Sequence, residues 1–573
     1  MYLLYLTMKT PNGMIALGIL LYSLLLAILC QVCIRKKKYA VLRIACILPA
    51  IVALFHYGIY GELALRKFRY LYAEALIPLI YLLPGKEKIV VNLKAVGITL
   101  AVLVICFLFQ LDSISHPMIH NYTRYGYTES FERMLDTLEK EYCLNSWKRM
   151  DYGALRERYL PMVEEAEKNE DEVLFAAIIK EVCYRFYDTH VSAGISGFVR
   201  KNLREYAAGN DYGLSMIRLN DGSVIAICTF PEEEGSPLDV RGLGIHDGTQ
   251  ILAWDGVEID EAIRSVECTD DRFPVESNED VFRPIYLAGK GGDSIDVTFV
   301  NDEGEVQEIT LSRLDSYDNR LSWVKSMLLH KDQDRENFSY RMLDDKCGYL
   351  CITAESYDSL KDDIASARGG YYPELTEFYA GMIRKLKEQG MEYLVVDIRN
   401  NGGGYDCVAG ALASLFTEEK RHMVSFGYED ASGYHIVENQ YIFPDGRYKD
   451  LPVALLVNSD CVSAGDGMAK FLGDCDNVTL MGITASSGVN QNNGGYIYLT
   501  KHVCVYYPVF LSLSSEVEPL IDTDYTRENR IPLEVTIPMT REMALKMFDV
   551  EQNYPDLQDF ELEYAVKYLE NKR

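Results

Sequence analysis

The feature that most constrains the fold is a repeated strand–helix–strand pattern in the second half of the chain. The short apolar run "CGYLCIT" is followed by the amphipathic stretch "ELTEFYAGMIRKLKEQG" and then by the buried-strand pattern "EYLVVDI". The helical stretch stops at Gly390, a residue type typical of the position just after a helix. "PVALLV" followed by "SAGDGMAKFL" repeats the unit. Strands separated by helices favour a parallel arrangement, so we expect an α/β core with a partly parallel sheet.

The remainder of the chain predicts a multidomain protein, because 573 residues are too many for one hydrophobic core. "SFERMLDTLEKEY" places apolar residues at helical intervals, whereas "SVIAICTF" and "SIDVTFVNDEGEVQEITL" are short alternating runs with Gly and Asp turns. The expected parts are a membrane anchor with three or four transmembrane helices (1–111), a helical region (112–207), a small β-rich module (208–314), the α/β core (315–545) and a C-terminal helix (546–573).

A membrane anchor is expected from the uneven charge. The formal net charge is −28, yet residues 1–111 hold 12 Lys and Arg against 3 Asp and Glu. Uncharged runs of about 20 residues are long enough to cross ~30 Å of hydrocarbon as a helix. Basic loops between the runs favour a multi-pass cell-membrane protein, with the lipid bilayer as partner and residues 112–573 extracytoplasmic. The expected spans are 14–34, 44–61, 95–111 and a short, Pro-containing stretch at 75–85.

Composition also excludes some classes of partner. The acidic balance argues against nucleic acid, since phosphate binding needs a basic face. None of the 14 Cys forms a CxxC pair or a Cys/His cluster with zinc spacing, so no metal site is expected. Most Cys of residues 112–573 are expected to be buried as small apolar side chains. A disulfide between two of them is an alternative whose pairing the sequence does not give.

The stretch "VVDIRNNGGGYD", residues 395–406, carries the strongest local signal for chemistry. A strand pattern runs into Asp397 and Arg399, and three consecutive Gly follow. Glycines after a strand let backbone N–H groups approach a ligand closely, as in an oxyanion hole or an anion site. A nucleotide-binding loop is the alternative, but the Lys-Ser/Thr of a P-loop is missing and GxGxxG does not match.

A second stretch, "LLVNSDCVSAGD", raises the possibility of a serine nucleophile. An apolar run ends in a polar turn, Ser463 is followed by small residues, and a helical pattern begins. Ser463 can be a nucleophile or simply the N-cap of that helix. Cys461 could act as a thiol nucleophile, although burial at the strand end is the alternative that its position favours.

Together these motifs resemble one enzyme family. "DIRNNGGG" resembles the Asp-x-Arg-x-Asn-x-Gly-Gly signature of the carboxyl-terminal-processing (tail-specific) serine peptidases, and "LLVNSDCVSAGD" resembles their nucleophile turn. "RGLGIHDGTQILAWDGVEI" resembles part of a PDZ domain, and the resemblance spans roughly residues 121–540. It implies a ClpP/crotonase-like α/β peptidase core with serine endopeptidase activity, and the anchor expected from residues 1–111 would make this enzyme membrane-anchored. Such an enzyme works through an acyl-enzyme without a cofactor, on protein or peptide substrates bound by their C-termini.

The chain departs from this family in one respect. Many members pair the serine with a lysine, but the matching place around Ser487 and Gly488 has none. "YRFYDTHVSAG" resembles the segment that supplies a histidine in the tricorn-like and chlamydial-protease-like branch. "RENRIPLEV" resembles the segment that supplies a glutamate there, although its Gly is absent. A serine hydroxyl needs an adjacent base, and histidine titrates in the right range. We therefore expect Ser463 as nucleophile, His190 as general base and Glu528 as orienting carboxylate.

The resemblance also implies roles for neighbouring residues. The backbone N–H groups of Ala464 and of Gly402 or Gly403 are expected to hold the oxyanion. In the PDZ-like module, Gly213 and Leu214 lie where a peptide-binding loop would be. The supporting residues expected beside the site are Thr189, Asp397 and Arg399.

Alternatives remain open at this point. A solitary histidine such as His190 is often structural, and Asp522 or Asp524 could replace Glu528 as the carboxylate. The missing lysine also motivates a different class of function, a catalytically inactive peptide-binding scaffold on the same fold.

Overall fold

The structure is a computed structural model. It describes residues 25, 47–55, 118–229, 239–268, 273–314, 317–331, 336–356, 371–430, 432–549 and 559–572. The chain divides into two compact units, which are described separately: residues 1–143 with 493–510, and residues 144–492 with 511–573.

In the first unit, a small sheet carries one helix. The strand β1 (Met118–Asn121) pairs in parallel with β16 (Asn492–Tyr498), and β17 (Val503–Leu513) is the next strand after β16. The helix α7 (Tyr127–Glu141) follows β1 and buries an apolar face that includes Phe131.

The second unit is built on a six-stranded sheet in the order β18-β15-β14-β11-β10-β9. All neighbours run parallel except β9, which is antiparallel to β10. The loops after β10, β11, β14 and β15 therefore gather at one edge of the sheet. The strands are β9 (Phe338–Met342), β10 (Cys347–Ile352), β11 (Tyr393–Asp397), β14 (Val453–Leu456), β15 (Val478–Gly482) and β18 (Val535–Thr536).

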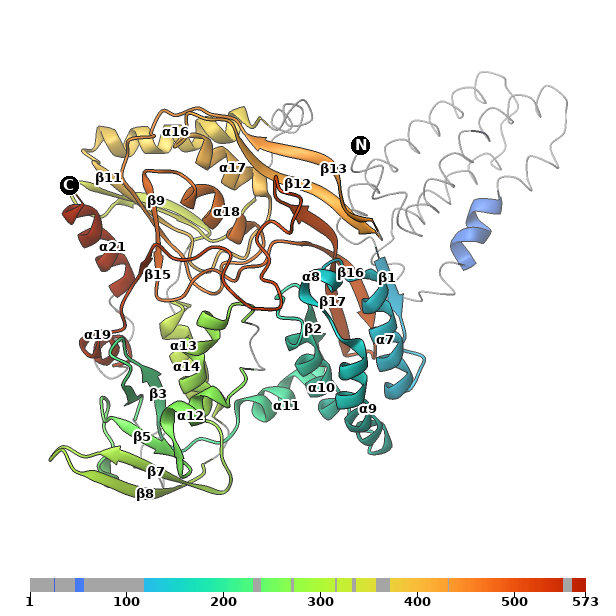
Figure 1. Ribbon diagram of the computed structural model, residues 1–573, viewed down its shortest axis with the longest axis vertical. Helices are drawn as coiled ribbons and strands as arrows, with labels where there is room; N and C mark the ends of the chain where they lie inside the picture. Colours follow the sequence, from blue (N-terminus) through green and yellow to red (C-terminus); the bar gives the residue numbers. More distant parts are fainter. Residues whose placement is uncertain are drawn as a thin grey trace, which may run out of the picture. The chain divides into compact units, whose positions relative to one another are not determined.

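Both faces of this sheet are buried, as the continuous apolar strands predict. Leu394 and Val396 of β11 join one hydrophobic cluster with α16, α17 and α18, whereas Tyr393 and Val395 join a second cluster that includes α21 (Figure 1). The expected α/β core is thus present. The helices are α16 (Pro373–Glu388), α17 (Asp406–Ser414), α18 (Ala464–Gly473), α19 (Arg541–Met547) and α21 (Phe560–Asn571).

A long hairpin lies beside this core. The strands β12 (Arg421–Asp430) and β13 (Gly433–Ile442) pair antiparallel, and residues 511–513 of β17 pair with β12.

The helical region that precedes the core positions one loop of interest. Asp171 caps the N-terminus of α10 by accepting a hydrogen bond from the backbone N–H of Leu174. The loop after α10 carries Asp188, Thr189 and His190 into the next strand. The elements are α8 (Asn145–Lys148), α9 (Tyr152–Lys168), α10 (Glu172–Tyr184), β2 (Ser192–Ile195) and α11 (Gly197–Ala208).

The β-rich module contains a two-stranded sheet, β3-β4, and a four-stranded sheet in the order β6-β5-β7-β8. The helix α13 packs against β3. The bounds are β3 (Ser215–Arg218), β4 (Val224–Ile227), η2 (Arg241–Leu243), β5 (Ile251–Trp254), β6 (Val257–Glu258), α12 (Ile259–Arg264), α13 (Glu276–Leu287), β7 (Ser294–Val300), β8 (Val306–Ser312) and, after them, α14 (Asp318–Leu328).

The prediction of N-terminal transmembrane helices is wrong for the described part of the chain, where no helix is both long and apolar enough to span a bilayer. Of residues 1–111, only residues 25 and 47–55 are described. The predicted multi-pass location in the cell membrane is wrong for the same reason. The other residues of the four expected spans lie outside the described residues.

Candidate active site

Ser463 lies in a sharp turn between β14 and α18. Its backbone has φ 61° and ψ −125°, and its side chain makes no capping hydrogen bond to α18. The N–H of Ser463 donates to the carbonyl of Val489 at 3.0 Å. A positive φ is uncommon for a residue with a side chain. A strained strand-to-helix turn of this kind presents a serine hydroxyl at the edge of a sheet. The local geometry therefore suits a nucleophile better than an N-cap.

The glycine-rich loop after β11 lies directly against this turn. A Cβ atom on Gly403 would lie 2.9 Å from the backbone N of Ala464 and 2.9 Å from Cβ of Ser463. A Cβ on Gly404 would lie 1.9 Å from the carbonyl O of Glu355. Both contacts are too close for any side chain, and Gly403 has φ +86°. Glycine is thus required here by close approach as well as by backbone conformation.

The N–H groups of both predicted glycine donors are already engaged, one within the glycine-rich loop and one with the segment that follows β10. The N–H of Gly403 donates to Oδ1 of Asn401 at 2.8 Å, and the N–H of Gly402 donates to the carbonyl of Thr353 at 3.2 Å. Ala464 is the first residue of α18, where an N–H has no partner within the helix. In this conformation the Ala464 N–H is better placed than those of the two glycines to receive an oxyanion.

His190 is buried in an acidic environment. Its Nδ1 lies 3.4 Å from Oδ1 of Asp188, and its backbone N–H donates to the same oxygen at 2.9 Å. Burial alone would lower the pKa of His190, but the carboxylates of Asp188, Asp522 and Asp466 raise it above its ordinary value. Asp466 lies three residues after Ser463 on α18. His190 thus lies within the electrostatic reach of the helix that Ser463 begins.

Residues 488–490, in the stretch where many family members have a lysine, donate hydrogen bonds to the carboxylates of Asp466 and Asp522. The carboxylate of Asp466 accepts the N–H groups of Gly488 at 2.8 Å and Val489 at 3.2 Å, and burial raises the pKa of Asp466 to about 7. The carboxylate of Asp522 accepts the N–H of Asn490 at 3.0 Å. Among the described residues, no hydrogen bond joins Ser463 directly to His190. Such bonds are often long in an enzyme without substrate.

The structure does not bring the carboxylate of Glu528 to His190. Glu528 is exposed, and within the described residues no hydrogen bond or ion pair joins the two. Asp522 is fully buried, burial raises its pKa to about 6, and its Oδ1 has no hydrogen-bond partner in the described chain. Asp524 is partly exposed and accepts the N–H of Thr526 at 2.7 Å. Of the three carboxylates that the sequence offered, Asp522 is the buried one.

Asp397 and Arg399 anchor the start of the glycine-rich loop. Nη2 of Arg399 lies 2.6 Å from Oδ2 of Asp397 and 2.6 Å from Oδ2 of Asp559, while Nη1 lies 3.1 Å from Oε2 of Glu561. Nε2 of His330 lies 2.7 Å from the same oxygen of Glu561. These side chains form a buried ion cluster beneath the loop. The ion pairs join the start of the glycine-rich loop to the C-terminal segment and so support the loop.

The residues predicted to bind peptide lie in the β-rich module. The N–H of Gly213 donates to Oδ1 of Asp211 at 2.8 Å, and Leu214 is fully buried in the hydrophobic cluster. Asp211 is itself paired with buried Arg320 at 3.0 Å. This loop is therefore held internally in the present conformation.

Sequence reasoning missed two buried residues of this region, Lys148 and Asp188. Nζ of Lys148 donates to the carbonyl of Tyr187 at 2.8 Å and to Oγ1 of Thr523 at 2.9 Å. Asp188 could have been noticed, since it is the acidic residue of the Asp-x-His motif. Lys148 gave no signal, because its partners lie far away in the sequence.

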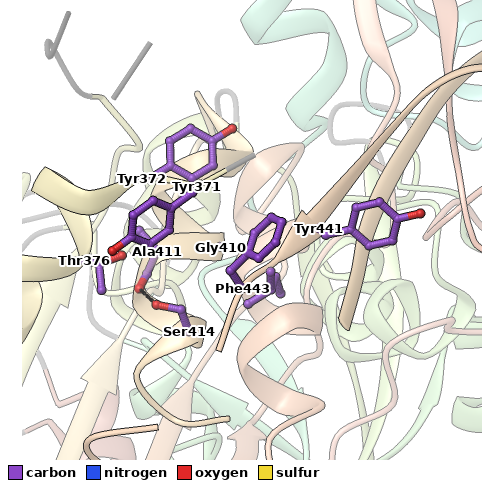
Figure 2. Close-up of a pocket in the computed structure, with 9 residues that line it drawn as sticks. Tyr371, Tyr372, Thr376, Gly410, Ala411, Ser414, Tyr441 and Phe443 are labelled. Atoms are coloured by element: carbon purple, nitrogen blue, oxygen red, sulfur yellow. Dashed lines mark hydrogen bonds between the residues drawn. The ribbon is translucent and has the colours of Figure 1, made fainter. Parts of the chain in front are cut away.

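Two further features have no role in the site. Sγ of buried Cys461 donates to the carbonyl of Ile398, and burial raises the pKa of its thiol, which disfavours a thiolate. Figure 2 shows a hollow beside α17, where the hydroxyl of Ser414 donates to the carbonyl of Ala411 at 2.7 Å. Its volume of about 10 Å³ leaves room for one water molecule. None of the predicted site residues lines this hollow: its walls are Tyr371, Tyr372, Thr376, Gly410, Ala411, Ser414, Tyr441, Ile442 and Phe443.

Comparison with known proteins gives one family. Residues 347–517 match the model of peptidase family S41. A search of curated proteins found no match. The solved structure of mature CPAF complexed with lactacystin is similar over 78% of this chain and 98% of that chain, at 14% identity and a TM-score of 0.47. The tricorn protease (78% and 37%, 15% identity, TM-score 0.33) and the photosystem II D1 C-terminal processing protease (70% and 92%, 16% identity, TM-score 0.29) are also similar. At these sequence identities and TM-scores, the three structural similarities say nothing about the function of this chain.

The region that matches the family model also contains the two motifs that resemble this family. The matched residues contain both the glycine-rich loop and Ser463, which the fold packs against each other. The family predicted from the motifs is thereby confirmed. The part of the chain that carries these motifs, residues 347–517, thus matches peptidase family S41, a family of serine-type peptidases.

Proposed function

We propose that the chain is an endopeptidase that cleaves protein or peptide substrates through an acyl-enzyme formed on Ser463. The observation that carries the proposal is the close approach of Gly403 to Ser463 and to the Ala464 N–H. This approach puts the Ala464 N–H and the Gly403 loop beside a serine whose backbone is held in a strained turn at a helix start. His190, buried among carboxylates, serves as the general base.

The proposed reaction has two halves. Oγ of Ser463 attacks the carbonyl carbon of the scissile bond, and its proton passes to Nε2 of His190. The negative oxygen of the tetrahedral intermediate accepts the N–H of Ala464. It also accepts the N–H of Gly403 once Asn401 releases that group. His190 then gives its proton to the leaving amine, and water hydrolyses the ester by the reverse steps.

Labelling with a fluorophosphonate probe tests the proposal. The probe should form a covalent bond with the wild-type protein and none with Ser463→Ala, and Ser463→Ala should lose hydrolysis of a fluorescent unfolded protein. Ser459→Ala is a matched control, because Ser459 lies in the same turn and its hydroxyl makes no hydrogen bond within the described residues. Equal labelling of Ser463→Ala and the wild type would end the proposal.

A second candidate is an inactive peptide-binding scaffold. It is favoured by the engaged N–H groups of Gly402 and Gly403 and by the missing contact between Ser463 and His190 among the described residues. It predicts peptide binding without turnover. Hydrolysis that disappears in Ser463→Ala would exclude it.

We also propose that the β-rich module binds substrate C-termini in the manner of a PDZ domain, through the loop at Gly213 and Leu214. In the described chain β3 pairs with a strand on one side only, and α13 packs against it. An added peptide strand would take this edge. A peptide with a free C-terminus should be cleaved with a lower KM than its amidated form. Equal KM values would contradict a role for the carboxylate.

A further inference from the structure

The carboxylate closest to the ring of His190 comes from its own loop. Oδ1 of Asp188 lies 3.4 Å from Nδ1 and also accepts the backbone N–H of His190 at 2.9 Å. Asp188 has no exposed surface and His190 is 6% exposed. The backbone hydrogen bond holds Oδ1 of Asp188 beside the imidazole, although Nδ1 makes no hydrogen bond within the described residues in this conformation. No other carboxylate of the described residues lies within 4 Å of its ring nitrogens.

The other carboxylates that act on His190 bind other donors through at least one oxygen, while Oδ1 of Asp522 has no hydrogen-bond partner within the described residues. Asp466 binds the N–H groups of Gly488 and Val489. Asp522 uses Oδ2 to bind Asn490 and the side chain of Gln491. These two carboxylates act on the ring through their charge, whereas Glu528 is exposed.

A buried cation, Lys148, lies within electrostatic reach of Asp188. Lys148 is 6% exposed, and its ammonium group is fixed by the carbonyl of Tyr187 and the hydroxyl of Thr523. Burial lowers the pKa of Lys148, opposed by Asp188, Asp522 and Asp524. Burial would raise the pKa of Asp188, yet His190 and Lys148 together hold it below its ordinary value. The pair thus keeps Asp188 ionised although it has no contact with solvent.

We propose that Asp188 is the residue that positions His190, that Lys148 keeps Asp188 charged, and that this pair takes the part expected of Glu528. The inference rests on the proposed function of Ser463 and His190. An Nδ1–H donated to Asp188 leaves the lone pair of Nε2 free to accept the proton of Ser463. The negative charge then stabilises the imidazolium that forms.

The pH dependence of kcat/KM separates positioning from a merely structural role. Catalysis needs neutral His190, so kcat/KM rises with pH through the pKa of His190. Asp188→Asn removes the nearest negative charge, so the acidic limb should move to lower pH. At the same time kcat should fall on the order of 10⁴-fold, as when a triad loses its carboxylate.

Lys148→Met should move the acidic limb of the kcat/KM profile to higher pH, opposite to the shift expected for Asp188→Asn. Without the ammonium group, the pKa values of Asp188 and His190 both rise, and activity returns only at higher pH. General damage to the fold gives no reason for opposite shifts in the two variants. Asp171→Asn is the matched control, because this carboxylate caps the other end of α10 and Asn caps equally well. Asp171→Asn should have the same kcat and the same acidic limb of kcat/KM as the wild type.

The outcomes separate the two proposals. If Ser463→Ala keeps its activity, the proposed function fails. If Ser463→Ala is inactive while Asp188→Asn keeps wild-type kcat and limb, or if Glu528→Gln shows the changes expected of Asp188→Asn, only the role of Asp188 fails. Nitrogen-15 NMR of the wild-type histidines, with His190→Gln to assign the signal, needs neither variant. The Nδ1–H tautomer of neutral His190 is expected, and the Nε2–H tautomer would overturn the inference.

Discussion

Ser463 holds its backbone at φ 61°, a conformation that costs an L-residue of order 1–3 kcal/mol. The surrounding turn maintains it: the N–H of Ser463 donates to Val489, and the N–H of Val462 donates to the carbonyl of Asn401. The hydroxyl is thereby kept from capping α18. At this scale, a few backbone contacts hold the turn that carries the Ser463 hydroxyl.

Gly403→Ala tests the close approach at this turn. The new Cβ would press on Ala464 N and Ser463 Cβ, so kcat should fall at least tenfold and the free energy of unfolding by about 2 kcal/mol. Gly222→Ala is a matched control, with φ +87° against +86° and open space around its Cβ. It should lose stability from backbone strain alone and keep kcat. Equal kcat for the two variants would contradict the packing described here.

Much of the site could be predicted from the sequence because its signals are local. The glycine run, the serine turn and the Asp-x-His motif each lie within a dozen consecutive residues. Lys148 could not be predicted, since its ammonium group binds Thr523, 375 positions away. Glu528 illustrates the converse limit: a motif placed it near the site, yet its side chain faces solvent.

At the scale of elements, the period of the apolar residues predicted strands and helices well. The expected helix near Gly390 is α16, and Gly390 has φ +105° at its end. The order of strands and the reversal of β9 could not be predicted, because pairing depends on contacts between distant segments. Several carboxylates of the second unit are buried, among them Glu355, Asp466 and Asp522.

This burial predicts how stability depends on pH. Burial raises the pKa of Asp466 to about 7, and those of Asp406 and Asp522 to about 6. Between pH 4 and these values the folded chain holds protons that the unfolded chain has released. Rising pH therefore favours unfolding, by a few kcal/mol in all between about pH 5 and pH 8. Urea denaturation at the two pH values measures the change, and greater stability at pH 8 would contradict it. Asp188, whose pKa is lowered, acts in the opposite sense at lower pH.

At the scale of the whole chain, composition was the weakest guide. Apolar runs and charge asymmetry favoured transmembrane helices, but run length predicts a span only where the residues form one long helix. The described residues contain no such helix. Long-range ion pairs proved more informative, since Arg399 of the glycine-rich loop is joined to Asp559 and Glu561 of the C-terminal segment.

Glu561→Gln tests this long-range support. Arg399 and His330 each lose a charged partner in a fully buried site, so the free energy of unfolding should fall by about 3–5 kcal/mol. Loss of the support beneath the glycine-rich loop should also lower kcat. Glu570→Gln, at the exposed far end of the same helix, should change neither. Equal melting temperatures for the two variants would show that the cluster contributes little.

The dependence of Arg399 on Asp559 and Glu561 has a consequence for biosynthesis. Ser463, His190 and the glycine-rich loop are all translated before residues 559–561. A nascent chain that has already exposed its nucleophile still lacks the carboxylates that brace the loop from below. The arginine of the glycine-rich loop can therefore gain these two partners only after residues 559–561 have been synthesised.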